Sequence, residues 1–237
     1  MEIISYGGGV QTVALLILNA QGKIENPAEC AVFADTGSEM PATLDHVYST
    51  MVLYGKENNI PIHTVKSENG PLHEYVMEGN AVIPMFGDRG GMIMRRCTHR
   101  WKIQPVRRWL RAQGVKSAVV QLGISIDEVQ RAKDSNVKWA QNRYPLIELR
   151  LSRQDCINTI KEAGLPVPPR SACWMCPFRK HSEWTLMKDT EEFKKAVELE
   201  KSLSGLYLHP SCVPLDQAIG DQYSMFQDDE CGGYCWT

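Results

Sequence analysis

Eight residues near the start of the chain have the composition of a loop that binds phosphate. The segment from Ser5 to Thr12 reads Ser-Tyr-Gly-Gly-Gly-Val-Gln-Thr and lies between two apolar stretches. Glycine lets the backbone turn sharply and bring its N–H groups close to an anion, and a following helix points its partially positive N-terminus at the same place. We expect nucleotide phosphates to bind here, and a plain glycine turn between a strand and a helix is the alternative.

The sequence of this segment excludes two common phosphate-binding motifs, because it contains neither Gly-x-x-x-x-Gly-Lys-Ser/Thr nor Gly-x-Gly-x-x-Gly. It resembles instead the PP-loop of ATP pyrophosphatases, which reads Ser-Gly-Gly-x-Asp-Ser. Gly8 and Gly9 match the two glycines, Thr12 replaces the last serine, and Gln11 stands where aspartate is usual. The resemblance implies a bound adenine nucleotide beside a neutral side chain at position 11.

The cysteines suggest a second kind of chemistry. Cys173 and Cys176 have the two-residue spacing that lets two thiolates face one metal or cluster, and Cys231 and Cys235 offer two more sulfurs near the C-terminus. A redox-active pair is the competing interpretation of the first two. Of the eight cysteines, Cys30, Cys156 and Cys212 are interpreted as reduced thiols without a role.

A longer resemblance covers nearly the whole chain. The segment from Cys97 to Val106, Cys-Thr-His-Arg-Trp-Lys-Ile-Gln-Pro-Val, resembles the Cys-Cys-x-x-x-Lys-Val-x-Pro-Leu segment of phosphoadenylyl- and adenylyl-sulfate reductases. Six matches follow the family's order. In chain order they are Phe33 to Gly37 with Thr43, the Cys97 segment, Gly123-Ile124 with Arg131, Tyr144 to Ile147, Cys173-x-x-Cys176, and Glu230-Cys231-Gly232. The chain therefore resembles the phosphoadenosine phosphosulfate (PAPS) reductase-like family of the PP-loop superfamily.

The resemblance implies a set of metal ligands. In the cluster-bearing reductases, adjacent cysteines and a later Cys-x-x-Cys hold a [4Fe-4S] cluster. Here Cys97, Cys173 and Cys176 match, Thr98 occupies the adjacent position, and Cys235 is the expected fourth ligand with Cys231 as the alternative. Zinc held by the same thiolates remains an alternative to the cluster.

The expected nucleotide site combines the glycine loop with later strand ends. Asp35 and Glu128 are candidates for contacts to the nucleotide or to Mg²⁺, although an acid at a strand end is as often a helix cap. The expected nucleotide-binding residues are Ser5, Gly7, Gly8, Gly9, Gln11, Thr12, Asp35, Thr36, Gly37, Gly123, Glu128 and Arg131. The expected catalytic residues are Lys102, Asp35 and Cys231.

Three functions remain open from the sequence. In the first, ATP binds, the loop holds the departing pyrophosphate, and an acceptor oxygen attacks the α-phosphorus, priming the acceptor for sulfur transfer. In the second, PAPS or adenylyl sulfate (APS) binds and the Cys231 thiolate attacks its sulfur. The third is a metal-stabilised nucleotide-binding subunit without turnover. The intact glycine loop favours the first.

Charge is distributed unevenly along the chain. The net charge is −2, yet seven basic residues and no acid lie between Arg95 and Arg111. We interpret this run as a solvated helix face or as a track for phosphates of a nucleic-acid acceptor. Other expected partners are a sulfur donor protein, such as a cysteine desulfurase or thioredoxin, and a second copy of the chain in a homodimer.

Alternating strands and helices must position these residues. Apolar runs near residues 31–34, 62–65 and 115–122 predict strands, separated by helices near 43–58 and 105–112. Such alternation predicts an open, mostly parallel α/β sheet with helices on both faces, in the Rossmann-like manner of PP-loop proteins. Ligands of these sheets bind beyond the carboxyl ends of the strands.

Two regions are expected along the chain. Residues 1–165 are the predicted nucleotide-binding α/β domain, and residues 166–237, after a proline-rich break, are a Cys-rich metal-binding region that packs on the nucleotide site. Residues 68–94, rich in Gly, Pro and Met, are interpreted as a mobile substrate loop or an ordinary surface insertion. No apolar stretch is long enough to span a bilayer and no signal peptide precedes the loop, so we expect a cytoplasmic protein without membrane contact.

Overall fold

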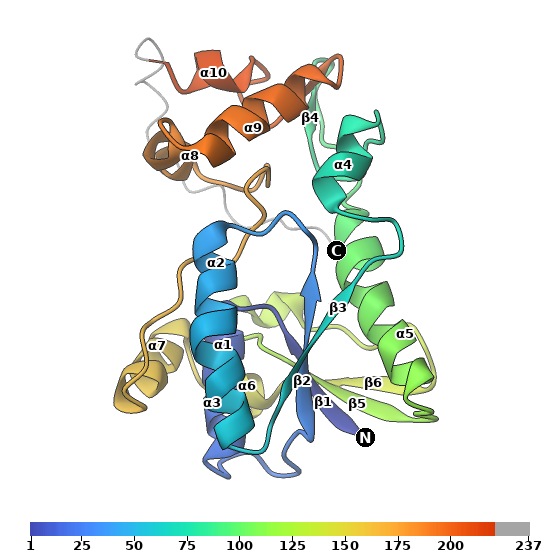
Figure 1. Cartoon of the computed structure of the whole chain (residues 1–237), viewed down its shortest axis with the longest axis vertical. Coiled ribbons are helices and arrows are strands. Elements are labelled where there is room, and N and C mark those ends of the chain that lie inside the picture. Colours follow the sequence, from blue (N-terminus) through green and yellow to red (C-terminus); the bar gives the residue numbers. More distant parts are fainter. Residues whose placement is uncertain (221–237) are drawn as a thin grey trace. The chain divides into compact units, whose positions relative to one another are not determined.

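A five-stranded parallel sheet forms the centre of the fold in the computed structural model, which describes residues 1–220. The strand order is β3-β2-β1-β5-β6 (Figure 1). The strands are β1 (Glu2–Tyr6), β2 (Cys30–Asp35), β3 (Ile62–Lys66), β5 (Ala118–Leu122) and β6 (Ala140–Arg143). The predicted class, an open parallel α/β sheet, is therefore confirmed.

Burial on both faces explains why β2 reads as a continuous apolar run and why two adjacent isoleucines, Ile3 and Ile4, lie in β1. Successive side chains of a strand point to opposite faces, so each strand contributes to two cores. Ile4 and Phe33 belong to the core on one face, whereas Ile3 and Val32 belong to the core on the other. Strands of this kind occur where helices cover both faces of a parallel sheet.

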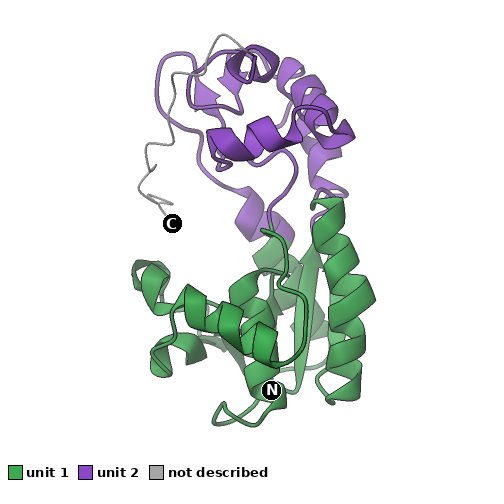
Figure 2. Ribbon diagram, turned by 90° about the vertical axis from the view of Figure 1, so that its left-hand side faces the viewer, with its two compact units in different colours: residues 1–35, 39–67, 102–171 green, residues 36–38, 68–101, 172–237 purple. Residues whose placement is uncertain are grey.

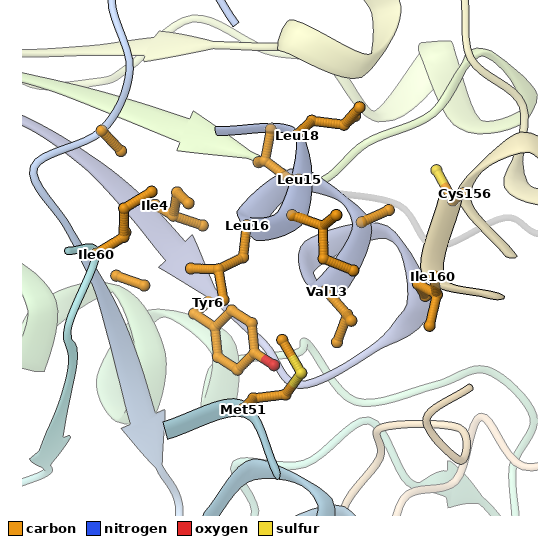
Figure 3. Close-up of a cluster of buried hydrophobic side chains, with 14 of the residues drawn as sticks. Ile4, Tyr6, Val13, Leu15, Leu16, Leu18, Met51, Ile60, Cys156 and Ile160 are labelled. Carbon is orange, nitrogen blue, oxygen red and sulfur yellow. The ribbon is translucent and has the colours of Figure 1, made fainter. Parts of the chain in front are cut away.

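The larger core joins the sheet to α1 (Val10–Ala20), α6 (Pro145–Glu148) and α7 (Arg153–Glu162). Figure 3 shows side chains of α1 between Tyr6 of β1 and the α7 side chains Cys156 and Ile160. A helical stretch that runs through α2 (Pro41–Asp45), the π-helical η1 (His46–Met51) and α3 (Val52–Glu57) adds Val47 and Met51 to this core. This stretch matches the helix predicted near residues 43–58.

Helix α5 (Gln104–Ala112) covers the opposite face. Its Val106 and Leu110 pack in one cluster with Ile3 of β1 and Val32 of β2. The helix begins directly after a second π-helical segment, η2 (Thr98–Ile103). Helices thus cover both faces of the sheet, as the alternation of strands and helices predicted.

The described residues divide into two compact units that are interleaved in the sequence (Figure 2). Unit 1, which contains the sheet, comprises residues 1–35, 39–67 and 102–171. Unit 2 comprises residues 36–38 and 68–101 together with the residues from 172 onward. These bounds differ from the linear division after residue 165, because residues 68–101 group with the C-terminal residues.

Unit 2 is built from short elements. Strand β4 (Phe86–Gly87) pairs antiparallel with β7 (Leu206–Tyr207). Its helices are α4 (Leu72–Met77), α8 (His181–Met187), α9 (Glu191–Lys201) and α10 (Leu215–Ala218). Residues 68–94 therefore contain a helix and a strand that their composition did not predict. Among residues 1–220, no helix has both the length and the apolar character that crossing a membrane requires.

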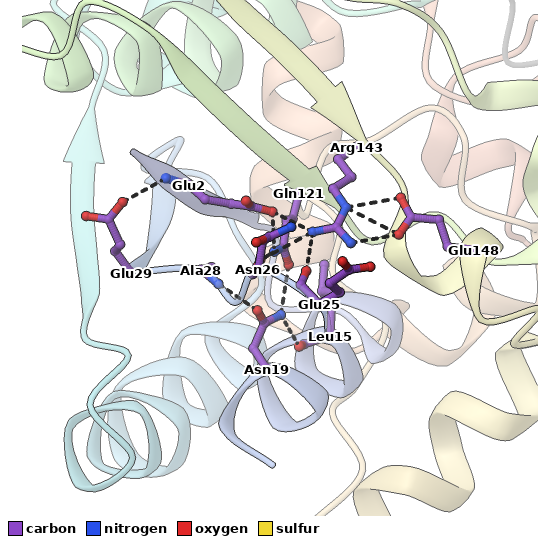
Figure 4. A network of polar contacts seen from close by, with 10 residues as sticks. All are labelled: Glu2, Leu15, Asn19, Glu25, Asn26, Ala28, Glu29, Gln121, Arg143 and Glu148. Carbon is purple, nitrogen blue, oxygen red and sulfur yellow. Dashed lines mark hydrogen bonds and ion pairs between the residues drawn. The ribbon is translucent and has the colours of Figure 1, made fainter. Parts of the chain in front are cut away.

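A buried polar network ties α1 to the sheet (Figure 4). Asn19 donates to Gln121 at 2.8 Å, and its carbonyl oxygen accepts from the backbone of Ala28 at 2.8 Å. Gln121 in turn donates to Glu2 at 2.8 Å, and Glu2 pairs with Arg143 at 2.9 Å. Each of these amide groups has a partner, so the network joins α1 to β1, β5 and β6 without leaving the amides of Asn19 and Gln121 unsatisfied.

Candidate nucleotide site

A cavity of about 200 Å³ lies within unit 1, where the glycine loop follows β1. In the sheet, β2 and β3 lie on one side of β1, and the later strands β5 and β6 lie on its other side. The chain therefore changes the side on which it adds strands, and this switch point lies between β1 and β5. Ligands of open α/β sheets bind at such a switch point, beyond the carboxyl ends of the strands. The cavity is lined by Ser5, Tyr6, Gly7, Thr12, Ala34, Lys102, Leu122, Gly123, Ile124 and Arg131.

Two glycines at the cavity have different roles. A Cβ atom at Gly123 would lie 2.7 Å from Cγ2 and 2.9 Å from the backbone nitrogen of Thr12, so only glycine permits this approach of β5 to the start of α1. A Cβ atom at Gly7 would meet no atom within 4 Å. Gly7 therefore leaves open space in the cavity, while Gly123 is required for packing.

The glycine loop is held from several sides. Gly8 has a φ of +71°, which favours glycine, and a Cβ atom there would lie 3.0 Å from Val47. Thr12 Oγ1 donates to the carbonyl of Gly9 at 3.0 Å, and Ser171 Oγ donates to the carbonyl of Gly7. Within residues 1–220 no side chain caps the N-terminus of α1, and uncapped N–H groups in the first turn of a helix can bind an anion.

Two cationic side chains reach the cavity, and each has a carboxylate partner. Lys102 Nζ lies 3.1 Å from Oε1 of Glu39, whose side chain is fully buried. Arg131 Nη1 lies 2.5 Å from Oε1 of Glu128, three residues earlier in the 3₁₀-helix η3 (Ile126–Arg131). These ion pairs hold the two cationic side chains at the cavity, where N–H donors of this kind can bind phosphate groups.

The structure brings part of the predicted site together. Of the predicted nucleotide-binding and catalytic residues, Ser5, Gly7, Thr12, Lys102, Gly123 and Arg131 line the cavity. Gly8 and Gly9 belong to the same loop, while Gln11 and Glu128 join each other by a 3.3 Å hydrogen bond. Asp35, at the end of β2, pairs with Lys66 of β3 at 3.6 Å and does not line the cavity.

Thr36 and Gly37 belong to unit 2, next to the cysteine pair. The Thr36 hydroxyl lies 3.4 Å from Cys173 Sγ, and the backbone of Trp174 donates to the carbonyl of Ser38 at 2.9 Å. A Cβ atom at Gly37, whose φ is +69°, would lie 2.9 Å from Pro71. The three residues after β2 therefore have a packing role in unit 2, and their predicted nucleotide contact stays a prediction.

The three predicted cysteine ligands within the described residues also lie in unit 2. Cys176 donates from its backbone to the carbonyl of Cys173 at 3.1 Å, which closes the turn between them. Burial raises the pKa of the Cys176 thiol, and nearby Cys97 raises it further, while the backbone N–H of Phe178 and the charge of Arg95 lower it. Burial is the largest of these effects and favours the protonated thiol in the metal-free chain.

Residues 1–220 contain no group of three or more His, Cys, Asp or Glu side chains that is placed to hold a metal ion. The predicted ligands Cys231 and Cys235 lie outside the described residues, as does the predicted nucleophile role of Cys231. The described part of the chain therefore does not present a complete site for a cluster or for zinc, and both stay predictions.

The sequence did not predict two residues that contact the site, Glu39 and Arg153. Glu39 follows the Asp35 motif by four residues, and only the fold places its buried carboxylate against Lys102. Arg153, at the start of α7, donates to Gln11 at 2.9 Å. The sequence carries no signal for that contact, because 142 residues separate the two partners.

The fold and this site define an α/β protein with a cavity at the switch point of a parallel sheet. No protein-family model matches the chain, and no curated protein matches it. Among solved structures, the phosphate complex of phosphoadenylyl-sulfate (PAPS) reductase from Candida auris is similar to it. The two are 14% identical, with a TM-score of 0.48, over 73% of this chain and 80% of the other.

Proposed function

We propose that this chain is a PAPS reductase-like enzyme of the PP-loop superfamily that binds ATP and adenylylates an acceptor for sulfur transfer. The observation that carries the proposal is the cavity, which joins the glycine loop, Lys102 and Arg131 at the switch point of the sheet. Its volume of about 200 Å³ is below that of most pockets for whole ligands, and it suits the phosphate end of a nucleotide.

In the proposed reaction, an acceptor oxygen attacks the α-phosphorus of ATP, and the bond from that phosphorus to the leaving pyrophosphate breaks. The N–H groups of the glycine loop and of the first turn of α1 bind the pyrophosphate. Lys102 and Arg131 stabilise the negative charge that develops on the phosphate oxygens. Such a transfer depends on positioning and on preorganised charge more than on an acid or a base.

Mg²⁺ bound with ATP would neutralise phosphate charge, and Asp35 is its proposed protein contact. A [4Fe-4S] cluster or zinc is proposed at Cys97, Cys173 and Cys176 with Cys235 or Cys231, and no step of the reaction is assigned to it. The proposed acceptor is a nucleic acid or a small molecule. The run from Arg95 to Arg111 supports a nucleic acid, because phosphates bind arginine-rich surfaces.

A second candidate is a PAPS or APS reductase, which the Glu230-Cys231-Gly232 motif supports. In this reaction the Cys231 thiolate attacks the sulfur of the substrate, forming a thiosulfonate on the cysteine and releasing the nucleotide. A reductant such as thioredoxin then releases sulfite. The two candidates differ in which bond of the nucleotide breaks.

Product analysis separates the candidates. Purified protein is incubated with Mg²⁺ and ATP and a candidate acceptor, or with PAPS or APS and reduced thioredoxin. We expect pyrophosphate and the adenylylated acceptor from ATP, at least tenfold less of both after Lys102→Met, and no change after the matched Lys116→Met at an exposed position of unit 1. Sulfite release that requires Cys231 would establish the reductase instead, and nucleotide binding without any product would establish the non-catalytic subunit.

A further inference from the structure

The glutamine at position 11 is held by two charged side chains of unit 1. Its Nε2 donates to Glu128 Oε2 at 3.3 Å, and its Oε1 accepts from Arg153 Nη1 at 2.9 Å. Gln11 therefore uses a donor and an acceptor at the same time, which a carboxylate cannot do. An acidic side chain at this position would face the carboxylate of Glu128 and repel it.

Glu128 connects this glutamine to the cavity. One carboxylate oxygen accepts from Gln11, and the other accepts from Arg131 Nη1 at 2.5 Å. Arg131 lines the cavity. Because both oxygens of Glu128 have protein partners, the geometry favours a role in holding Arg131 over the predicted contact to Mg²⁺.

The backbone around Glu128 is fixed at the start of α7. Ile126 donates from its backbone to the carbonyl of Leu151 at 3.0 Å, and the backbone N–H of Arg153 donates to the carboxylate of Asp127. Arg153 thus contacts both η3 and Gln11. The contacts join three segments that are far apart in the sequence into one support for Arg131.

We propose that Gln11, Glu128 and Arg153 are positioning residues that hold Arg131 ready for the terminal phosphate of the nucleotide. The inference rests on the proposed function, because it requires the nucleotide to bind in this cavity. A guanidinium carries five N–H donors, and the bond to Glu128 engages one nitrogen, so an anion can bind without a change of side-chain position. Holding the side chain in advance lowers the entropic cost of binding.

An exchange of amide and carboxylate tests the proposal. Dissociation constants for Mg²⁺-ATP are measured by titration calorimetry for wild type, Q11E, E128Q, the double variant Q11E/E128Q, and R131A. We expect R131A to weaken binding about tenfold, and Q11E and E128Q each about three- to tenfold. The double variant should return to within about twofold of wild type, since the isosteric exchange restores one carboxylate and one amide between the two arginines.

A matched control is available on α9. Glu191 and Lys194 form an ion pair of the same spacing, three residues apart, at 2.6 Å in unit 2. Glu191→Gln should leave the dissociation constant unchanged. The melting temperature should stay close to that of wild type in every variant, because exposed ion pairs contribute little to stability.

Two results would overturn the proposal. If wild type binds ATP and the losses in Q11E and E128Q add up in the double variant, the residues do not act as a unit. If E128Q weakens binding equally in the R131A background, Glu128 does not act through Arg131. A wild-type protein that binds no Mg²⁺-ATP would instead overturn the proposed function, and the positioning role with it.

Discussion

At the scale of single residues, the cavity depends on which glycines are open to it and which are packed. Gly123 is so close to Thr12 that any side chain would push β5 away from α1. Gly7 has free space where its side chain would be. Substitutions at these two positions therefore have different consequences, although both residues line the same cavity.

Gly7→Val should remove nucleotide binding and preserve the fold. The added side chain meets no protein atom within 4 Å of its Cβ position and instead fills space beside the loop that the phosphates require. We expect ATP to bind at least tenfold more weakly, about 1.4 kcal/mol, in titration calorimetry, with an unchanged circular dichroism spectrum. Gly87→Val, where a Cβ atom meets only Gly90 at 3.8 Å, is the control in unit 2. Unchanged affinity in Gly7→Val would refute the placement of the phosphates.

At the scale of elements, unit 2 depends on one buried carboxylate. Glu200 of α9 accepts from the backbone of Leu208 and of Leu215, each at 2.6 Å. The residue is 5% exposed, and burial raises its pKa while the two backbone N–H groups lower it. This side chain therefore joins α9 to the residue directly after β7 and to the first residue of α10 (Leu215–Ala218).

Removal of this carboxylate should destabilise the protein. Glu200→Ala leaves two buried N–H groups without their acceptor, and hydrogen bonds to charged groups contribute about 1.5–3 kcal/mol each. We expect the free energy of unfolding in urea to fall by about 3 kcal/mol, and by less than about 0.5 kcal/mol in the control Glu198→Ala, an exposed position of the same helix. Equal effects of the two substitutions would contradict the role of Glu200.

His209, directly after the segment that Glu200 holds, should make stability depend on pH. Its ring is 2% exposed, and burial, together with the charge of His181 at 3.3 Å, lowers its pKa from 6.5 to about 4. The unfolded chain therefore takes up a proton near pH 6.5 that the folded chain does not bind until about pH 4. Stability contributed by neutral His209 is complete above pH 6.5 and decreases as the pH falls to about 4, by up to about 3 kcal/mol.

The contribution of His209 is measured by comparing how much stability wild type and His209→Gln each lose as the pH falls. Glu200 acts in the opposite direction, because its raised pKa favours the folded state as the pH falls, so wild type alone does not report on His209. Urea unfolding at pH 7.5 and pH 4.5 should show a smaller loss of stability in His209→Gln than in wild type. The exposed His99→Gln serves as the control and should follow wild type. A loss in His209→Gln as large as that in wild type would contradict the assignment.

At the scale of the whole molecule, the site is assembled from segments that are remote in sequence. The glycine loop, Lys102 and the 122–131 segment all contribute to one cavity of unit 1. Parallel strands make this possible, because their carboxyl ends meet at one edge of the sheet. With Ala34 of β2, the lining comes from four separate segments, so a ligand that fills the cavity contacts residues that are remote in sequence.

Hydrogen exchange with and without nucleotide should reveal that pattern. Mg²⁺-ATP is expected to slow amide exchange in residues 5–12 and 122–131, because it binds at their backbone and stabilises the local structure. Helix α9 (Glu191–Lys201) should show no slowing and provides an internal control. Protection confined to α9, or to the loop without the 122–131 segment, would contradict a single nucleotide site in this cavity.

Much of the fold follows from local patterns in the sequence. The runs at 31–34, 62–65 and 115–122 predicted β2, β3 and β5. Strand β2 is buried throughout and carries apolar residues on both faces, whereas β3, at the edge of the sheet, keeps only Ile62 and Val65 partly buried. The segment 68–94 did not reveal α4 and β4, because elements this short show too little periodicity to be recognised and take their stability from contacts with distant parts of the chain. The helix α4 has only six residues, and β4 has two.

The sequence by itself determined the fold class, the glycine loop and the identity of the residues that follow each strand, because these depend on local spacing and on the two periods of strand and helix. Only the tertiary structure decided which of those residues meet. It paired Asp35 with Lys66, gathered Lys102 and Arg131 at one cavity, and joined Gln11 to Glu128 across 117 positions. Contacts of this length depend on the order of strands in the sheet, which no local pattern encodes.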